Sequence, residues 1–201
     1  NFTNLSTLRS NSYGLSFLHR QLDYLPNPTK GFLLNSEISA GSRKSQLNDT
    51  SLVERSTIYS SSIQIDIFVP LTARNVLHIA NKTNLYYAPV IFQNEVLRFG
   101  GQATLRGFNE EELYATLSTV FSIEYRFLLD RNSHIFAFFD QGIYENNSAI
   151  YYKDHPYGFG AGLSFGTNIG MFSISYGLGK QFGDPVLIRN GKIHFGYIAY
   201  F

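Results

Sequence analysis

The stretch Lys192-Ile-His-Phe-Gly-Tyr-Ile-Ala-Tyr-Phe201 alternates between an apolar set of side chains and a mixed set. The apolar set is Ile193, Phe195, Tyr197, Ala199 and Phe201. A period of two predicts a β-strand with one apolar face. Such a strand needs a neighbour, because an open edge leaves backbone groups unpaired. A closed barrel in a lipid bilayer provides both a neighbour and an apolar solvent, but the last strand of a soluble sandwich is an equal alternative for this stretch alone.

Composition narrows the possible classes of protein. The chain has 201 residues, which suits one large β domain. Its formal net charge is +1 with scattered Lys and Arg, so no nucleic-acid partner is expected. It has no cysteine, which excludes disulfides and thiolate metal sites. With 14 Tyr, 18 Phe and a mean hydropathy of −0.10, it is rich in interfacial aromatics but too polar for spanning helices.

Alternating segments recur along the whole chain, and no helix is predicted. The clearest is 116–129, where Leu117, Phe121, Ile123, Tyr125, Phe127 and Leu129 alternate with polar residues. The predicted strands are 12–22, 31–41, 57–70, 76–87, 116–129, 134–145, 157–167, 171–180 and 192–201.

The connections between these segments alternate in length. Short turns are predicted at 23–30, 72–75, 130–133 and 168–170, and long loops at 42–55, 88–115, 146–156 and 181–191. Short turns at one end and long loops at the other are typical of outer-membrane barrels and not of Greek-key sandwiches. The sequence therefore favours an antiparallel transmembrane β-barrel. Since single-chain bacterial barrels have even strand numbers, nine strands indicate either a miscount or the C-terminal part of a larger barrel.

A lone arginine, Arg106, lies between glycine-rich segments in the longest loop. One interpretation is a flexible surface loop with an incidental charge. The other is a loop folded into the barrel lumen, where Gly107 would allow an unusual backbone angle and Phe108 would fill an apolar gap. Buried charges are usually paired, and a planar guanidinium can bridge two acids. Glu124 and Asp140, on the polar faces of two predicted strands, are the candidate partners.

At these residues the chain resembles the outer-membrane β-barrel assembly factor superfamily, the bacterial surface antigen family that includes BamA, TamA and the two-partner secretion transporters. Leu105-Arg-Gly-Phe108 is similar to the family's (V/L/I)-R-G-(F/Y) motif. Further segments resemble family features in the family's order. They are Pro28-Thr-Lys-Gly31, Phe99-Gly-Gly101, Ile123-Glu-Tyr-Arg-Phe127, Phe138-Phe-Asp-Gln-Gly142 and the aromatic-ended last strand.

The resemblance implies a sixteen-stranded barrel in the bacterial outer membrane. Residues 1–201 would supply its last nine strands, and the first seven strands and the periplasmic POTRA domains would lie upstream. Loop 88–115 would fold into the lumen, with Arg106 paired to Glu124 and Asp140. Gly196 would weaken strand pairing and favour a labile seam. The residues assigned to this seam and to the C-terminal signal are His194, Gly196, Tyr200 and Phe201.

The chain departs from the family pattern at three places. Ala199 occupies a position where the family prefers a bulky residue, and Leu128-Leu129 ends a strand where the family often has proline. Phe136 and Phe138 share a strand face with Asp140, so the faces of segment 134–145 are less clean than those of its neighbours.

By resemblance, the expected function is insertion of β-barrel proteins into the outer membrane. The alternatives are a two-partner secretion channel and a membrane anchor for a fused soluble domain. Expected partners are outer-membrane lipids and lipopolysaccharide, unfolded β-barrel clients, and periplasmic or lipoprotein helper subunits. No catalytic residue, metal or cofactor is expected, because H-E-x-x-H is absent and the five His are scattered.

Overall fold

The computed structural model describes residues 6–47, 53–148 and 150–199. The predicted seam residues Tyr200 and Phe201 lie outside this part of the chain. Apart from one 3₁₀ turn, η1 (Ile188–Asn190), every regular element in it is a β-strand. None of these elements is a helix long and apolar enough to cross a membrane.

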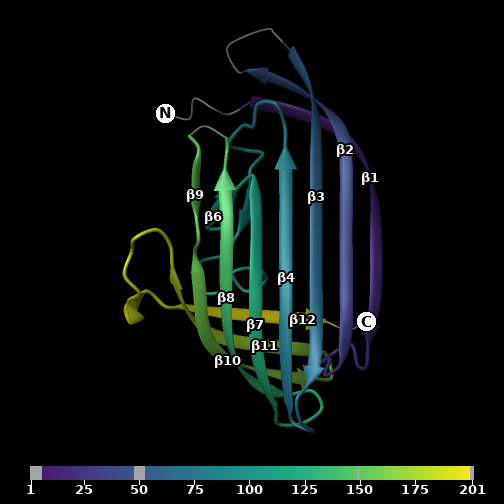
Figure 1. Cartoon of the computed structure of the whole chain (residues 1–201), viewed down its shortest axis with the longest axis vertical. Coiled ribbons are helices and arrows are strands. Elements are labelled where there is room, and N and C mark those ends of the chain that lie inside the picture. The colour runs from purple at the N-terminus through teal and green to yellow at the C-terminus, as the bar shows by residue number, and fades with distance from the viewer. Residues whose placement is uncertain (1–5, 48–52, 149, 200–201) are drawn as a thin grey trace.

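Nine long strands form one antiparallel sheet in the order β1-β2-β3-β4-β7-β8-β10-β11-β12 (Figure 1). Their bounds are β1 Ser6–Leu22, β2 Gly31–Leu47, β3 Val53–Pro70, β4 Asn75–Tyr87, β7 Leu117–Leu128, β8 His134–Asn146, β10 Tyr157–Thr167, β11 Gly170–Lys180 and β12 Lys192–Ala199. Three short strands are β5 Leu97–Phe99, which pairs with β6 Leu113–Ala115, and β9 Tyr152–Asp154, which pairs with β8. The all-β antiparallel prediction and its nine strands are confirmed. The sixteen-strand total stays a prediction.

The long loop predicted at 42–55 is wrong. β2 continues to Leu47 and β3 begins at Val53, with Ser42 paired to Thr57. The side-chain pattern fades here because both faces become polar, while backbone pairing continues. β1, β2 and β3 have 17 or 18 residues, more than the roughly 9–11 that cross a bilayer, so this hairpin wall extends beyond the apolar layer.

The sheet curls, and its two faces differ in polarity. In Figure 1, β1 to β8 run along the long axis, and β10 to β12 cross behind their lower ends. The convex face exposes alternating apolar side chains, such as Phe121, Ile123 and Tyr125 of β7. The concave face carries buried polar side chains, such as Ser118 and Glu124 on the same strand. This is the arrangement of a barrel wall with lipid outside and a polar lumen inside.

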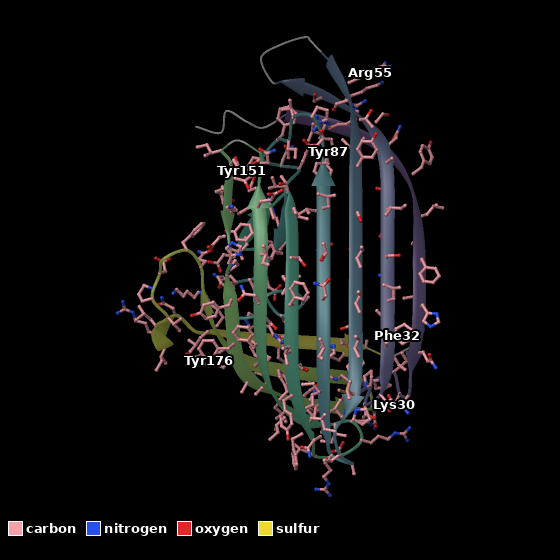
Figure 2. All side chains as sticks on the ribbon, in the orientation of Figure 1. Lys30, Phe32, Arg55, Tyr87, Tyr151 and Tyr176 are labelled. Atoms are coloured by element: carbon pink, nitrogen blue, oxygen red, sulfur yellow. The ribbon has the colours of Figure 1, made fainter. Side chains whose placement is uncertain are left out.

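The two ends of the sheet carry different connections, as the loop lengths predicted except at 42–55. Figure 2 shows Lys30 at the end with the short turns, and Tyr87 and Tyr151 at the end with the long loops. At the short-turn end, the Asp23 carboxylate accepts hydrogen bonds from the Thr29 amide at 2.9 Å, the Lys30 amide at 3.0 Å and the Thr29 hydroxyl.

The hydrogen bonds to the Asp23 carboxylate make the local stability of this turn dependent on pH. Partial burial opposes ionisation of Asp23, but the hydrogen bonds from Thr29 and Lys30 outweigh it and hold the carboxyl pKa below its ordinary value. A lowered folded pKa means that the stabilisation is complete above the unfolded pKa of about 4 and is lost as pH falls through the folded pKa. We expect Asp23→Ala to raise hydrogen exchange at the two amides severalfold at pH 7. Wild-type protection in this variant would exclude the capping role.

Candidate functional site

The segment between β4 and β7 lies against the concave face of the sheet and has three parts. An outer segment, 88–96, follows β4; the β5–β6 hairpin forms a stem; and the tip, 100–112, joins the two strands of the stem. Leu105 and Phe108 of the tip are buried, at 0% and 4% exposure. They belong to an apolar cluster that also contains Phe99, Leu113, Ala115, Val120 and Tyr144. The tip is therefore packed against the wall.

Arg106 contacts both carboxylates that the sequence analysis named. Its Nε and Nη2 donate to the two oxygens of Asp140 at 2.8 and 2.7 Å, and its backbone amide donates to Asp140 Oδ2 at 3.1 Å. Its Nη1 donates to Glu124 Oε2. The Asp140 and Glu124 side chains are 0% and 8% exposed. A bidentate, buried pair of this kind fixes orientation as well as charge, because the guanidinium fork is planar.

The contact between the Phe138 ring and Arg106 accounts for an aromatic residue on the same strand face as Asp140. The Arg106 guanidinium carbon lies 3.7 Å from the centroid of the Phe138 ring, within cation–π range. Phe136 and Phe138 are buried, whereas Ile135 and Phe139 are exposed on the other face. The register of β8 is therefore regular. Of its inward aromatics, Phe138 is covered by Arg106 of the loop, and Phe136 lies against Gly162 of β10.

The tip sits in a trough of glycines. Gly107 has φ of 93°, a conformation that L side chains rarely adopt. A Cβ on Gly158 of β10 would collide with the Arg106 carbonyl oxygen, and one on Gly179 of β11 would lie against Gly107 and Phe108. The bare concave face of β10 and β11 thus allows two backbones to approach closely.

A hydrogen bond joins the tip to the last strand of the sheet. The Gly107 amide donates to His194 Nε2 of β12 at 3.0 Å, so the tip contacts β7, β8 and β12 through polar atoms. A second link runs from Gln102 of the tip to β11, where the Ser175 hydroxyl donates to Gln102 Oε1 at 3.0 Å. The loop therefore spans the lumen between the two sides of the curled sheet.

A family model described as the Omp85 superfamily domain matches residues 3–197. The chain belongs to the Omp85 superfamily. This family consists of outer-membrane β-barrel proteins that insert or secrete polypeptides, in line with the resemblance seen in the sequence. The search of curated proteins returned no match.

In this Omp85 domain the Arg106 site continues into a network that the sequence analysis missed. Glu124 Oε1 accepts a hydrogen bond from Arg126 Nε at 2.8 Å. Arg126 Nη2 lies 3.1 Å from His78 Nδ1, and His78 Nε2 lies 2.8 Å from Asp66 Oδ1. Because Arg126 can only donate, His78 Nδ1 is the acceptor and its Nε2 carries the proton toward Asp66. Side chains alternate strictly between the two faces of neighbouring strands, and this alternation puts these four residues on the lumen face. It was the signal in the sequence that could have indicated the network.

The lumen of the Omp85 domain has an open hollow beside the loop, of about 680 Å³, with both apolar and charged residues in its lining. Asp66, His78, Glu124 and Arg126 line it, together with Gln102 of the tip. Across the described ranges, no group of three or more His, Cys, Asp or Glu is arranged to hold a metal ion. The arrangement suits charge pairing and reversible docking of the loop.

Proposed function

We propose that this protein inserts β-barrel polypeptides into the bacterial outer membrane, with the lumen loop coupled to a labile seam at β12. The observation that carries the proposal is the 3.0 Å hydrogen bond from the Gly107 amide to His194 of β12. Among the described residues, β12 is the last strand in the sheet order and pairs only with β11. An edge strand held by the loop can exchange hydrogen bonds with a client, and this work needs no cofactor.

The seam is where client, lipid and loop would meet. The convex sides of β11 and β12 expose Ile174, Tyr176, Ile193 and Phe195, which suit contact with outer-membrane lipid and lipopolysaccharide. Unfolded β-barrel proteins are the proposed clients. Periplasmic or lipoprotein helper subunits are proposed partners, in keeping with a family whose members act on polypeptides.

The insertion proposal can be tested with the protein purified at its natural length, with any bound subunits, and reconstituted in lipid vesicles. An unfolded outer-membrane β-barrel protein is added, and its folded form is followed by heat-modifiable electrophoresis. We expect folding at least tenfold faster than in protein-free vesicles. Folding at the rate of empty vesicles would reject the proposal.

Gly196 provides a sharper test of the seam. It lies inside β12, and a Cβ there would meet Gln102 at 3.6 Å and Ser173 at 3.8 Å, which are ordinary contacts. Since glycine weakens a strand by roughly 0.5–1 kcal/mol relative to alanine, Gly196→Ala should strengthen β12 pairing and slow client insertion about two- to fivefold without loss of fold. Unchanged insertion by this variant would mean that lability at Gly196 is not used.

A secretion channel is the alternative favoured by one observation, the hollow of about 680 Å³ beside the loop. A channel would need the tip to leave the lumen and a polypeptide to take its place. In the same vesicles, a secretion substrate would then become protected from added protease, with no acceleration of barrel folding. A fused soluble domain anchored by the barrel would give neither result.

A further inference from the structure

A second buried ion pair holds the outer segment, 88–96, far from Arg106. Arg43 of β2 and Glu95 are 2% and 8% exposed, and Arg43 Nη1 donates to Glu95 Oε2. Arg43 is placed by its own strand pair, since its Nε also donates to the Ser56 hydroxyl of β3 at 3.1 Å. The pair lies at the long-loop end of the β2–β3 hairpin, where Arg43 is in register with Ser56.

The Glu95 carboxylate is the hub of this contact. Besides Arg43, it accepts a hydrogen bond from the Tyr86 hydroxyl of β4 at 2.7 Å and one from the Phe92 amide at 3.1 Å. The Arg43 guanidinium also lies 5.2 Å from the centroid of the Phe92 ring. One side chain of the loop is therefore tied to β2, to β4 and to its own segment. A carboxylate with this many donors is built for a single position.

An apolar cluster lies beside the Arg43–Glu95 ion pair, since Tyr86 contacts both. Ile58 of β3 packs with Ala88, Ile91 and Val96 of the outer segment, and Tyr86 packs against this group. These residues bury apolar surface on the concave side of β3, a face that is otherwise mostly polar. The outer segment thus folds back over β4 and β3 toward β2.

We propose that Arg43 and Glu95 form a latch that holds the outer segment across the long-loop end of the lumen. The latch fixes the β2–β4 side of the loop, and Arg106 fixes the β7–β8 side. The loop is therefore held on both sides of the lumen, with the stem between the two attachment points. The latch closes the outer mouth, which is the long-loop end of the lumen. This inference goes beyond the proposed insertion activity and does not depend on it.

The latch predicts opening of the mouth without release of the tip. Arg43→Gln leaves Glu95 as a buried charge without its cation, so the outer segment should detach while Phe108 stays packed. In the natural-length protein we expect chymotryptic cleavage after Phe92 to rise at least tenfold, and the ion conductance of the protein in planar bilayers to increase severalfold. Cleavage after Phe108 should stay at the wild-type rate.

A double variant without either charge keeps the test usable if the single variant misfolds. Arg43→Gln with Glu95→Gln leaves no buried charge alone, so it should fold by heat-modifiable electrophoresis even where the single variant does not. Its cleavage after Phe92 should rise at least threefold, with a parallel rise in conductance. The matched control is Arg98→Gln, which removes an exposed arginine of the same loop, 3.7 Å from Glu111. It should change neither measurement.

Two results would overturn the latch. Wild-type cleavage after Phe92 in the folded double variant would show that the pair does not hold the segment. Faster cleavage with unchanged conductance would show that the segment does not close the mouth. Client insertion is measured separately, so loss of the insertion proposal would leave these readings intact.

Discussion

Arg106→Ala is expected to release the loop tip from the lumen and to remove most of the proposed insertion activity. The variant loses three hydrogen bonds to carboxylate oxygens from the side chain and the contact with the Phe138 ring. It also leaves Asp140 buried without a counter-charge. Breaking one side of a buried ion pair costs about 3–5 kcal/mol, more than a packed loop can absorb without moving.

Chymotryptic cleavage after Phe108 measures this release, because Phe108 is 4% exposed when the tip is packed. We expect cleavage to rise by about a hundredfold or more in Arg106→Ala, as about 3 kcal/mol implies. The cleavage rate of Arg106→Lys should lie between those of the wild type and Arg106→Ala, since lysine keeps the charge but not the planar guanidinium. Arg98→Ala, at an exposed site in the stem, is the control. Wild-type cleavage in Arg106→Ala would show that the tip is held without its charge.

Most of the fold could be predicted from the sequence, because lipid and a wet lumen impose opposite demands on the two faces of each strand. The prediction failed where that contrast ends. Residues 42–46 and 54–55 are all polar, yet their backbones continue the β2–β3 ladder. Side-chain alternation reports the solvent on each face of a strand, and backbone pairing does not require it.

The Arg106 site could be proposed from the sequence, because one loop arginine and two polar-face acids limit the pairings. Arg126 and His78 were missed for the opposite reason. Polar residues are expected on every lumen-facing position, so their presence marks no particular partner. Arg43 and Glu95 are separated by 52 positions, and β2 meets the outer segment only once the loop folds back over β3 and β4. Such a contact has no local signature.

The network also explains how one arginine can tolerate two buried acids. Glu124 is shared, with Oε2 facing Arg106 and Oε1 facing Arg126, whereas within the described part of the chain Asp140 is paired with Arg106 alone. Arg126 in turn is linked through His78 to Asp66. Charge on β3, β4, β7 and β8 is thus connected to the loop tip. Movement of the tip would therefore disturb these four strands, which suits the proposed coupling of the loop to β12.

Gly158→Val is expected to expel the tip as completely as Arg106→Ala, although it removes no charge. A Cβ on Gly158 would collide with the Arg106 carbonyl oxygen and lie 3.6 Å from the Leu178 carbonyl oxygen. Both neighbours are backbone atoms, and Gly107 is already confined between Gly177 and Gly179 of β11. Neither side can yield, so the cost should reach or exceed the upper end of the roughly 1–3 kcal/mol typical of overpacking.

Cleavage after Phe108 again measures the release, with heat-modifiable electrophoresis as the check on barrel folding. Gly183→Val in the β11–β12 loop is the matched control, since a Cβ there meets no atom within 4 Å. Slow cleavage in a folded Gly158→Val protein would mean that the tip can seat without the trough. Gly158 and Arg106 both hold the tip in the same packed position. The double variant should therefore destabilise the packed tip by less than the sum of the two single variants. Additive losses would instead mean that charge pairing and backbone approach hold different parts of the loop.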